Sequence, residues 1–193
     1  MQSVAGNNQG EFPVDVEIER RLLKRALGGD GRAFAELVEP HLDRCFRLAV
    51  RSCGDRALGE EAVQEALTLA HRELARYEPG TSLRGWLCAL AMRSASTLAR
   101  SERRRSVREL ASVPPEGLHG AEAILQAREL SRSVDLALAG LSEKRREAAL
   151  LRFDGGLSSR EIAEVMGISD AAVRQLVSEA TKVLRTVLVA TGQ

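Results

Sequence analysis

Two short amphipathic segments joined by a three-residue turn constrain this chain more than any other feature of its sequence. The segment SREIAEVMGISDAAVRQLVS occupies residues 159–178. Ser158 followed by Glu161 has the pattern of a capping box, which predicts a helix start. Gly167 supplies the left-handed backbone conformation of a tight turn, and Ala163 is small where two helices would cross. The pattern therefore predicts two helices that cross at a turn.

Helix pairs of this kind bind DNA in many proteins, with the second helix lying in the major groove. Arg and Gln form bidentate contacts with guanine and adenine edges, and hydroxyl groups suit phosphates. We expect DNA contacts at Ser169, Ala171, Arg174, Gln175 and Ser178. A plain helical hairpin without a DNA role is the alternative. From residue 140 onward, eight Lys/Arg and seven Asp/Glu leave a net charge of +1, so most affinity for DNA has to come from elsewhere.

The remaining chain also has the apolar periodicity of helices. Aromatic residues make up only 3% of it, whereas Leu and Ala dominate its apolar residues, a composition that favours helices over a β-sandwich or barrel. In the first half of the chain we expect four helices: one from about Asp15 to Leu27, one capped by Asp30 and kinked at Pro40, one from Asp55 to near Tyr77, and one capped by Thr81 or Ser82. The second half adds helices at about 121–139, 142–153, 159–166 and 170–189.

A stretch without periodicity divides the chain. Residues 111–120, ASVPPEGLHG, are rich in Pro and Gly, as in a linker. The N-terminal residues are polar and end at Pro13. We expect a disordered leader at 1–14, a helical domain at 15–108, a linker at 109–124 and a helix-turn-helix domain at 125–193. The expected fold class is all-α, with two small helical domains joined by a linker.

Arginine gathers at the end of the first predicted domain. Residues 93–108 contain six Arg and one Glu, a net charge of +5, whereas the whole chain has a net charge of only +1. This local patch is the strongest candidate for a phosphate-binding surface in the chain. A solvated helix end that is favourable to its own dipole is the alternative.

Catalytic and metal-binding patterns do not occur in the sequence. It has no GxGxxG, P-loop or HExxH motif and only three His, so we expect neither an enzyme nor a cofactor nor a metal. Cys45, Cys53 and Cys88 are expected to be free buried thiols. A metal site built from His41, Cys45 and Cys53 is disfavoured because no CxxC or HxxxH pairing supports it. No apolar stretch is long enough to span a bilayer, so a soluble, cytoplasmic protein is expected.

Further motifs precede the predicted helix pair in a fixed order. They are FRLAVRSCGD (46–55), GEEAVQEAL (59–67), WLCALA (86–91) and LSEKRREAALLRF (141–153). In this order, over about residues 20–188, the chain resembles the extracytoplasmic-function group of sigma-70-type transcription initiation factors. The resemblance implies that the first domain binds the polymerase clamp and opens the minus-ten promoter element. It implies that the second domain binds the minus-thirty-five element.

The resemblance also implies roles for individual residues. Polymerase contacts are implied at Glu60, Glu61, Gln64, Glu65 and Arg72. Contacts with the opened promoter strand are implied at Arg93, Ser94, Thr97, Arg100, Arg103 and Arg104. The family usually has Asn and Asp at the positions of Arg93 and Thr97, so base capture is expected to differ there.

The implied partners are bacterial core RNA polymerase and promoter DNA. An inhibitory anti-sigma factor is a further partner of relatives, although no residue of this chain identifies one. We expect a sigma factor that directs promoter recognition and transcription initiation. The alternatives are a sigma-like interaction protein, or a helix-turn-helix regulator with weak or no promoter-opening activity.

Overall fold

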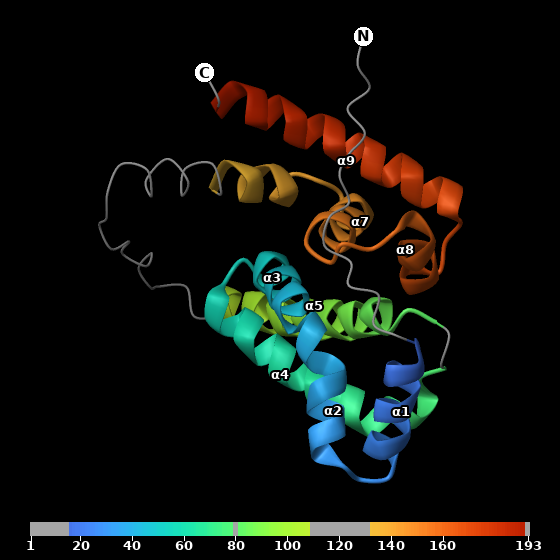
Figure 1. Ribbon diagram of the computed structural model, residues 1–193. Helices are drawn as coiled ribbons and strands as arrows, with labels where there is room; N and C mark the ends of the chain where they lie inside the picture. The colour runs from blue at the N-terminus through green and yellow to red at the C-terminus, as the bar shows by residue number, and fades with distance from the viewer. Residues whose placement is uncertain (1–15, 79–80, 109–131, 192–193) are drawn as a thin grey trace.

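The computed structural model describes residues 16–78, 81–108 and 132–191 (Figure 1). Every element in these ranges is a helix, which confirms the expected all-α fold class. The leader and linker expected at 1–14 and 109–124 lie outside the described residues.

The first helical unit runs from α1 to α5, with side-chain caps at the predicted places. Asp30 accepts hydrogen bonds from the backbone N–H groups of Arg32 and Ala33, and Asp55 accepts one from Leu58. These caps satisfy N–H groups that have no partner inside a helix. The elements are α1 (Val16–Leu27), α2 (Gly31–Val38), the 3-10 turn η1 (Glu39–His41), α3 (Leu42–Cys53), α4 (Arg56–Glu73), the 3-10 turn η2 (Leu74–Arg76) and α5 (Leu83–Arg108).

At Pro40, where the sequence predicts a kink, a 3-10 turn lies between two helices. Pro40 lies inside η1, and α3 begins directly after it at Leu42. Proline has no N–H to continue the helical hydrogen bonds, and its ring clashes with the preceding turn. The 3-10 turn accommodates both effects, and α2 and α3 follow one another along the chain on either side of it (Figure 1).

Small side chains allow α3, α4 and α5 to pack closely against one another. Ala49, Ala62 and Ala95, one from each helix, are all 0% exposed and form a cluster of their own. A β-carbon added at Gly59 of α4 would lie 2.5 Å from Cγ2 of Val50 on α3. The crossing of α3 and α4 therefore depends on the absence of a side chain at Gly59.

The second unit is built around the predicted helix pair. Residues 132–139 are helical, and α7 (Glu143–Phe153), α8 (Ser159–Met166) and α9 (Asp170–Thr191) follow. Helix α9 packs along α7 and α8, on their side away from the first unit (Figure 1). Leu151, Leu157, Ile162 and Val173 are 0% exposed and form the core of this second unit.

The two units are packed against each other in this structure. Helix α5 contacts α8, and α3 contacts α7. Buried side chains from both units, including Cys88, Leu157 and Ile162, belong to one continuous hydrophobic cluster. The two domains that the sequence predicts as separate modules are therefore in direct contact.

Candidate nucleic-acid and polymerase-binding surfaces

The turn between α8 and α9 has the geometry that its sequence predicts. Ser158 and Glu161 form a complete capping box, with the Ser158 N–H donating to the Glu161 carboxylate at 2.7 Å. Gly167 has φ +65°, in the left-handed region. The N–H of Ile168 then donates to the carbonyl of Ala163 at 3.1 Å. These bonds fix the crossing of the two helices through local interactions alone.

The start of α9 presents every residue that the sequence analysis assigned to it. Ser169 precedes α9 and accepts a hydrogen bond from the N–H of Ala172 at 3.2 Å. Arg174 pairs with Asp170 at 2.6 Å, and Nε2 of Gln175 donates to Glu179 at 3.2 Å. The exposed side chains on this surface are Ser169, Ala171, Arg174, Gln175 and Ser178.

A basic stripe runs along α5. Arg93, Thr97, Arg100 and Arg104 are exposed and recur at spacings of four, three and four residues, so they share one face of the helix. Ser94 faces the other way and is only 2% exposed. We assign Ser94 to packing and leave it out of the stripe. The Arg103 side chain lies outside the described residues.

The residues with implied polymerase contacts share the outer face of α4. Its inner face carries Gly59, Ala62, Ala66 and Ala70, all buried. The outer face is exposed and acidic apart from Gln64 and Arg72, and the ion pair of Glu60 with Arg56 at 3.0 Å lies within α4 itself. The exposed side chains are Glu60, Glu61, Gln64, Glu65 and Arg72.

One contact between the units was not predicted from the sequence. Nη2 of Arg84 lies 3.0 Å from Oε1 and 3.2 Å from Oε2 of Glu161, and the Ser82 hydroxyl donates a short hydrogen bond to Oε1. Burial by itself raises the pKa of Glu161. Hydrogen bonds from Ser158, Ser82 and Arg84 outweigh it and lower this pKa to about 2. Glu161 is therefore an ionised carboxylate shared by both units.

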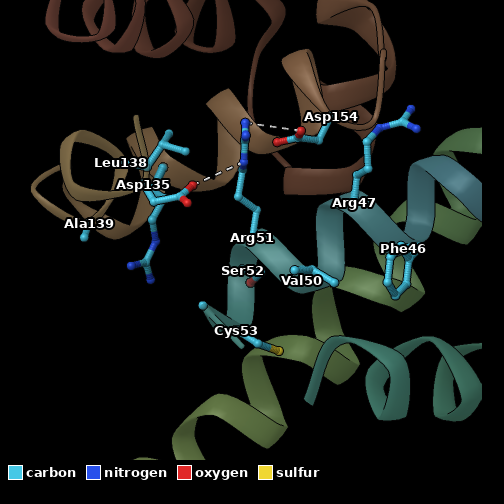
Figure 2. A pocket seen from close by; sticks show the side chains of 12 residues that line it. Phe46, Arg47, Val50, Arg51, Ser52, Cys53, Asp135, Leu138, Ala139 and Asp154 are labelled. Atoms are coloured by element: carbon cyan, nitrogen blue, oxygen red, sulfur yellow. Dashed lines mark hydrogen bonds and ion pairs between the residues drawn. The ribbon is translucent and has the colours of Figure 1, made fainter. Parts of the chain in front are cut away.

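Arg51 of α3 makes a second contact between the units. It lines a cavity of about 420 Å³ to which both units contribute residues (Figure 2). Its guanidinium lies 3.3 Å from Asp135 and 3.5 Å from Asp154, both in the second unit. Burial raises the pKa of Asp154, although Arg51 and Arg47 oppose the shift. Oppositely charged groups of the two units therefore meet at this cavity.

The cysteines and His41 occupy ordinary packing positions. Cys45 and Cys88 are buried as expected, whereas Cys53 is only partly buried, and its thiol lies 3.6 Å from the Ala95 carbonyl. Burial lowers the pKa of His41 to about 4, and the nearby charges of Arg84 and Arg44 act in the same direction. Among the described residues, no group of three or more His, Cys, Asp or Glu could hold a metal ion. No described helix has the length and apolarity needed to cross a bilayer.

Family comparisons match both helical units. The family model for sigma-70 region 2 matches residues 37–105, and that for sigma-70 region 4 matches residues 131–184. The sigma factor SigK of Mycobacterium sp. strain JLS, an extracytoplasmic-function (ECF) protein, is 30% identical over 172 residues, which cover 86% of this chain and 89% of SigK. The ECF sigma factor SigE of Mycolicibacterium smegmatis is 31% identical over 157 residues, covering 79% of this chain and 60% of SigE.

Two solved structures have a similar fold. CnrH, in complex with the cytosolic domain of CnrY, has a TM-score of 0.66 at 25% identity and covers 90% of this chain and 98% of its own. The sigma factor RpoE from Bartonella quintana has a TM-score of 0.64 at 22% identity over 80% of this chain and 96% of its own, which is a likeness of fold. The two matched regions and the identity with SigK show that this chain belongs to the ECF group of sigma-70 factors, which direct promoter recognition and transcription initiation by bacterial RNA polymerase.

Proposed function

We propose that three exposed surfaces divide the work of initiation in this chain. The outer face of α4 binds core RNA polymerase, the basic stripe of α5 binds the opened strand of the minus-ten element, and the start of α9 reads the minus-thirty-five element. The supporting observation is the exposure of these polar faces on helices whose opposite faces are buried. We further propose that the units act as modules at 15–108 and 125–193, since the two matched regions fall inside these bounds.

The stripe on α5 suits a binding-driven opening of DNA. Arg93, Arg100 and Arg104 place three positive charges along one face, and each can neutralise a phosphate of the displaced strand. Thr97 lies between them and donates its hydroxyl to the Arg93 carbonyl at 3.0 Å. Binding of unstacked bases and phosphates offsets the cost of separating a few base pairs. This role requires no catalytic group, so we propose a binding protein rather than an enzyme.

The start of α9 can exchange its internal partners for DNA at little cost. The pair of Arg174 with Asp170 is exposed and lies within one turn of helix, where such pairs contribute about 0.3–0.5 kcal/mol. A bidentate contact with a base edge discriminates by about 1–3 kcal/mol, so base contact outweighs the internal pair. We propose that Arg174 and Gln175 make the base contacts, while Ser169 and Ser178 contact phosphates.

The proposed partners follow from these surfaces and from the relatives. RpoE of Bartonella quintana was solved with the anti-sigma factor NepR, and CnrH with the cytosolic domain of CnrY. By analogy, we propose an anti-sigma factor as a third partner beside polymerase and promoter DNA. The proposed place of action is the cytoplasm, where bacterial polymerase and promoters meet.

Reconstitution with bacterial core RNA polymerase tests the proposal. The chain and core enzyme are incubated with fragmented genomic DNA, and transcript 5′ ends are sequenced. Start sites that share upstream elements are expected. Polymerase binding without initiation would instead favour a sigma-like interaction protein, and duplex binding without polymerase binding would favour a helix-turn-helix regulator.

Charge reversal on α4 tests the proposed polymerase surface. Glu61→Lys is expected to weaken binding to core polymerase about tenfold, because it places a positive charge in an acidic interface. Glu36→Lys is the matched control, since Glu36 is also exposed but lies on α2. Equal affinities of the two variants would remove α4 from the interface.

A further inference from the structure

A cavity of about 320 Å³ lies at the start of α5, next to the basic stripe. Its volume is near the lower end of the range for small-molecule sites, about 300–1,000 Å³, so it suits one planar ring system. Trp86, Ala89 and Arg93 line the cavity and recur at spacings of three and four residues, so the face of α5 that carries the stripe continues into it. The residues of the first unit that line it are Thr81, Ser82, Gly85, Trp86, Ala89 and Arg93.

The indole ring of Trp86 is held in place from behind. Its centroid lies 5.4 Å from that of the Tyr77 ring, with an angle of 37° between the ring planes. Tyr77 is 5% exposed, and its hydroxyl lies 2.7 Å from Oε1 of Glu19 and 2.9 Å from the Thr81 carbonyl. Trp86 itself is only partly buried. An aromatic side chain that is already oriented binds an unstacked base at a lower entropic cost, so Trp86 is a suitable stacking partner.

Ala89 keeps space open between Trp86 and Arg93. Residues three and four apart on a helix are neighbours on its surface, so the side chain at position 89 lies between the other two. The single methyl group of Ala89 leaves room there, whereas a longer side chain would occupy the cavity. A base that stacks on Trp86 can therefore extend its edge towards Arg93.

Arg93 brings an unpaired guanidinium to the cavity. Its side chain is exposed, and within the described part of the chain it has no ion-pair partner. Arg100 of the same stripe pairs with Glu143 at 3.4 Å, and neither Arg100 nor Arg104 lines the cavity. The hydrogen-bond donors of Arg93 are therefore available to whatever enters.

We propose that Arg93 selects a guanine of the opened promoter strand, which stacks on Trp86 in this cavity. In guanine, O6 and N7 are adjacent acceptors, and a guanidinium donates to both at once. Adenine has an amino donor beside N7, and a pyrimidine offers Trp86 only a single ring. The inference rests on the proposed function, because it takes the stripe of α5 as the surface that binds the opened strand.

The second unit supplies the other side of the cavity. Glu161, Glu164 and Val165 of α8 line it. The two carboxylates repel the phosphates on either side of a base, so we assign base binding to the side formed by the first unit alone. The test uses the full chain bound to core polymerase.

Duplexes with a short unpaired stretch test the base preference. The chain is bound to core RNA polymerase and incubated with duplex DNA whose unpaired stretch is randomised on one strand; bound DNA is then sequenced, and core polymerase alone gives the background. We expect guanine to be enriched over each other base by about 5- to 150-fold at one unpaired position, the ratio that a bidentate contact supplies. Enrichment of a different base, or no preference at any unpaired position, would overturn the proposal.

Glutamine at position 93 should change the preferred base. Gln forms a bidentate contact with N6 and N7 of adenine, so Arg93→Gln is expected to enrich adenine at the same position. Arg100→Gln is the matched control, because it removes one positive charge from the same stripe outside the cavity. It should weaken binding to every sequence and still prefer guanine. A general loss of charge or stability does not switch the base, so the same preference in Arg93→Gln and the wild type would remove Arg93 from base selection.

A larger side chain at position 89 tests the cavity itself. Ala89→Leu leaves Arg93 in place but fills the space beside Trp86, so it should abolish the enrichment of guanine. Circular dichroism checks that the helices of this variant are intact. Undiminished guanine enrichment by a folded Ala89→Leu variant would show that the base does not enter the cavity, and the proposal would fail.

Failure of this inference and failure of the proposed function give different results. If the chain adds no binding of the unpaired stretch to that of core polymerase alone, the stripe does not bind the opened strand, and both fail. An unpaired position that the chain enriches but that Arg93→Gln leaves unchanged overturns only the role of Arg93.

Discussion

Replacing Gly59 with alanine should destabilise the protein, although the same change in most helices stabilises it. Gly59 is the fourth residue of α4 and is buried against α3. An added β-carbon would lie 2.5 Å from Cγ2, 2.7 Å from Cα and 2.8 Å from N of Val50. Two of these atoms belong to the backbone, so a rotation of the Val50 side chain does not relieve the overlap.

The size of the effect follows from these distances. Carbon atoms pack at about 3.5–4.0 Å, so α4 has to move about 1 Å away from α3. Overpacking of this kind costs about 1–3 kcal/mol, and it acts against a gain in helix propensity of about 1 kcal/mol. Because two of the overlapped Val50 atoms are backbone atoms, the upper half of that cost applies, about 2–3 kcal/mol, so we expect a net loss of about 1–2 kcal/mol in the free energy of unfolding. For a chain of this size, that lowers Tm by about 2–8 °C.

Thermal unfolding followed by circular dichroism measures this change. Gly31→Ala is the matched control, because Gly31 begins α2 and a β-carbon there meets no atom within 4 Å. The Tm of that control should be unchanged or slightly raised. A Gly59→Ala variant that melted at or above the wild-type temperature would refute the account of the contact between α3 and α4.

Three further predictions concern the binding surfaces and the carboxylate of Glu161. Arg174→Ala should reduce discrimination at one base pair of the upstream element by about 1–3 kcal/mol, measured against duplexes with single substitutions; an equal loss on every duplex would make Arg174 a phosphate contact. Replacing Arg100 and Arg104 with Gln should lower the slope of log affinity against log salt by about 1–2, and an unchanged slope would take both out of the interface. Because the pKa of Glu161 is lowered from 4.5 to about 2, its ionised form stabilises the folded chain above about pH 4.5, and this contribution is lost as the pH falls towards 2. The decrease in Tm on acidification should be smaller for Glu161→Gln than for the wild type, and equal decreases would contradict the assignment.

The helix pair was predictable because its determinants are local. The capping box at Ser158 and the left-handed turn at Gly167 each depend on residues within a few positions of one another. The burial of Ser94 was also available from the sequence, since it follows Leu90 by four residues and Ala91 by three on the buried face of α5. A contact of Ser94 with the opened promoter strand was nevertheless predicted, because the resemblance to the family implied one at this position.

The contact between the units was not predictable in the same way. Glu161 has a complete local explanation as a capping residue, so nothing near it in the sequence indicates a second partner. That partner, Arg84, lies 77 positions earlier in the chain. The interruption at Pro40 was predicted in position, but not as a 3-10 turn. Whether a proline bends a helix or ends it depends on how the following segment packs, and here α3 packs on α4 and α5.

The alanine cluster shared by α3, α4 and α5 has a mechanical consequence. Ala49, Ala62 and Ala95 place single methyl groups where the three helices meet, so the backbones have little room to slide or tilt past one another. Helix α4 carries the acidic face, and α5 carries the basic stripe. A partner that binds one of these two helices therefore also fixes the position of the other, because the first unit moves as a rigid body.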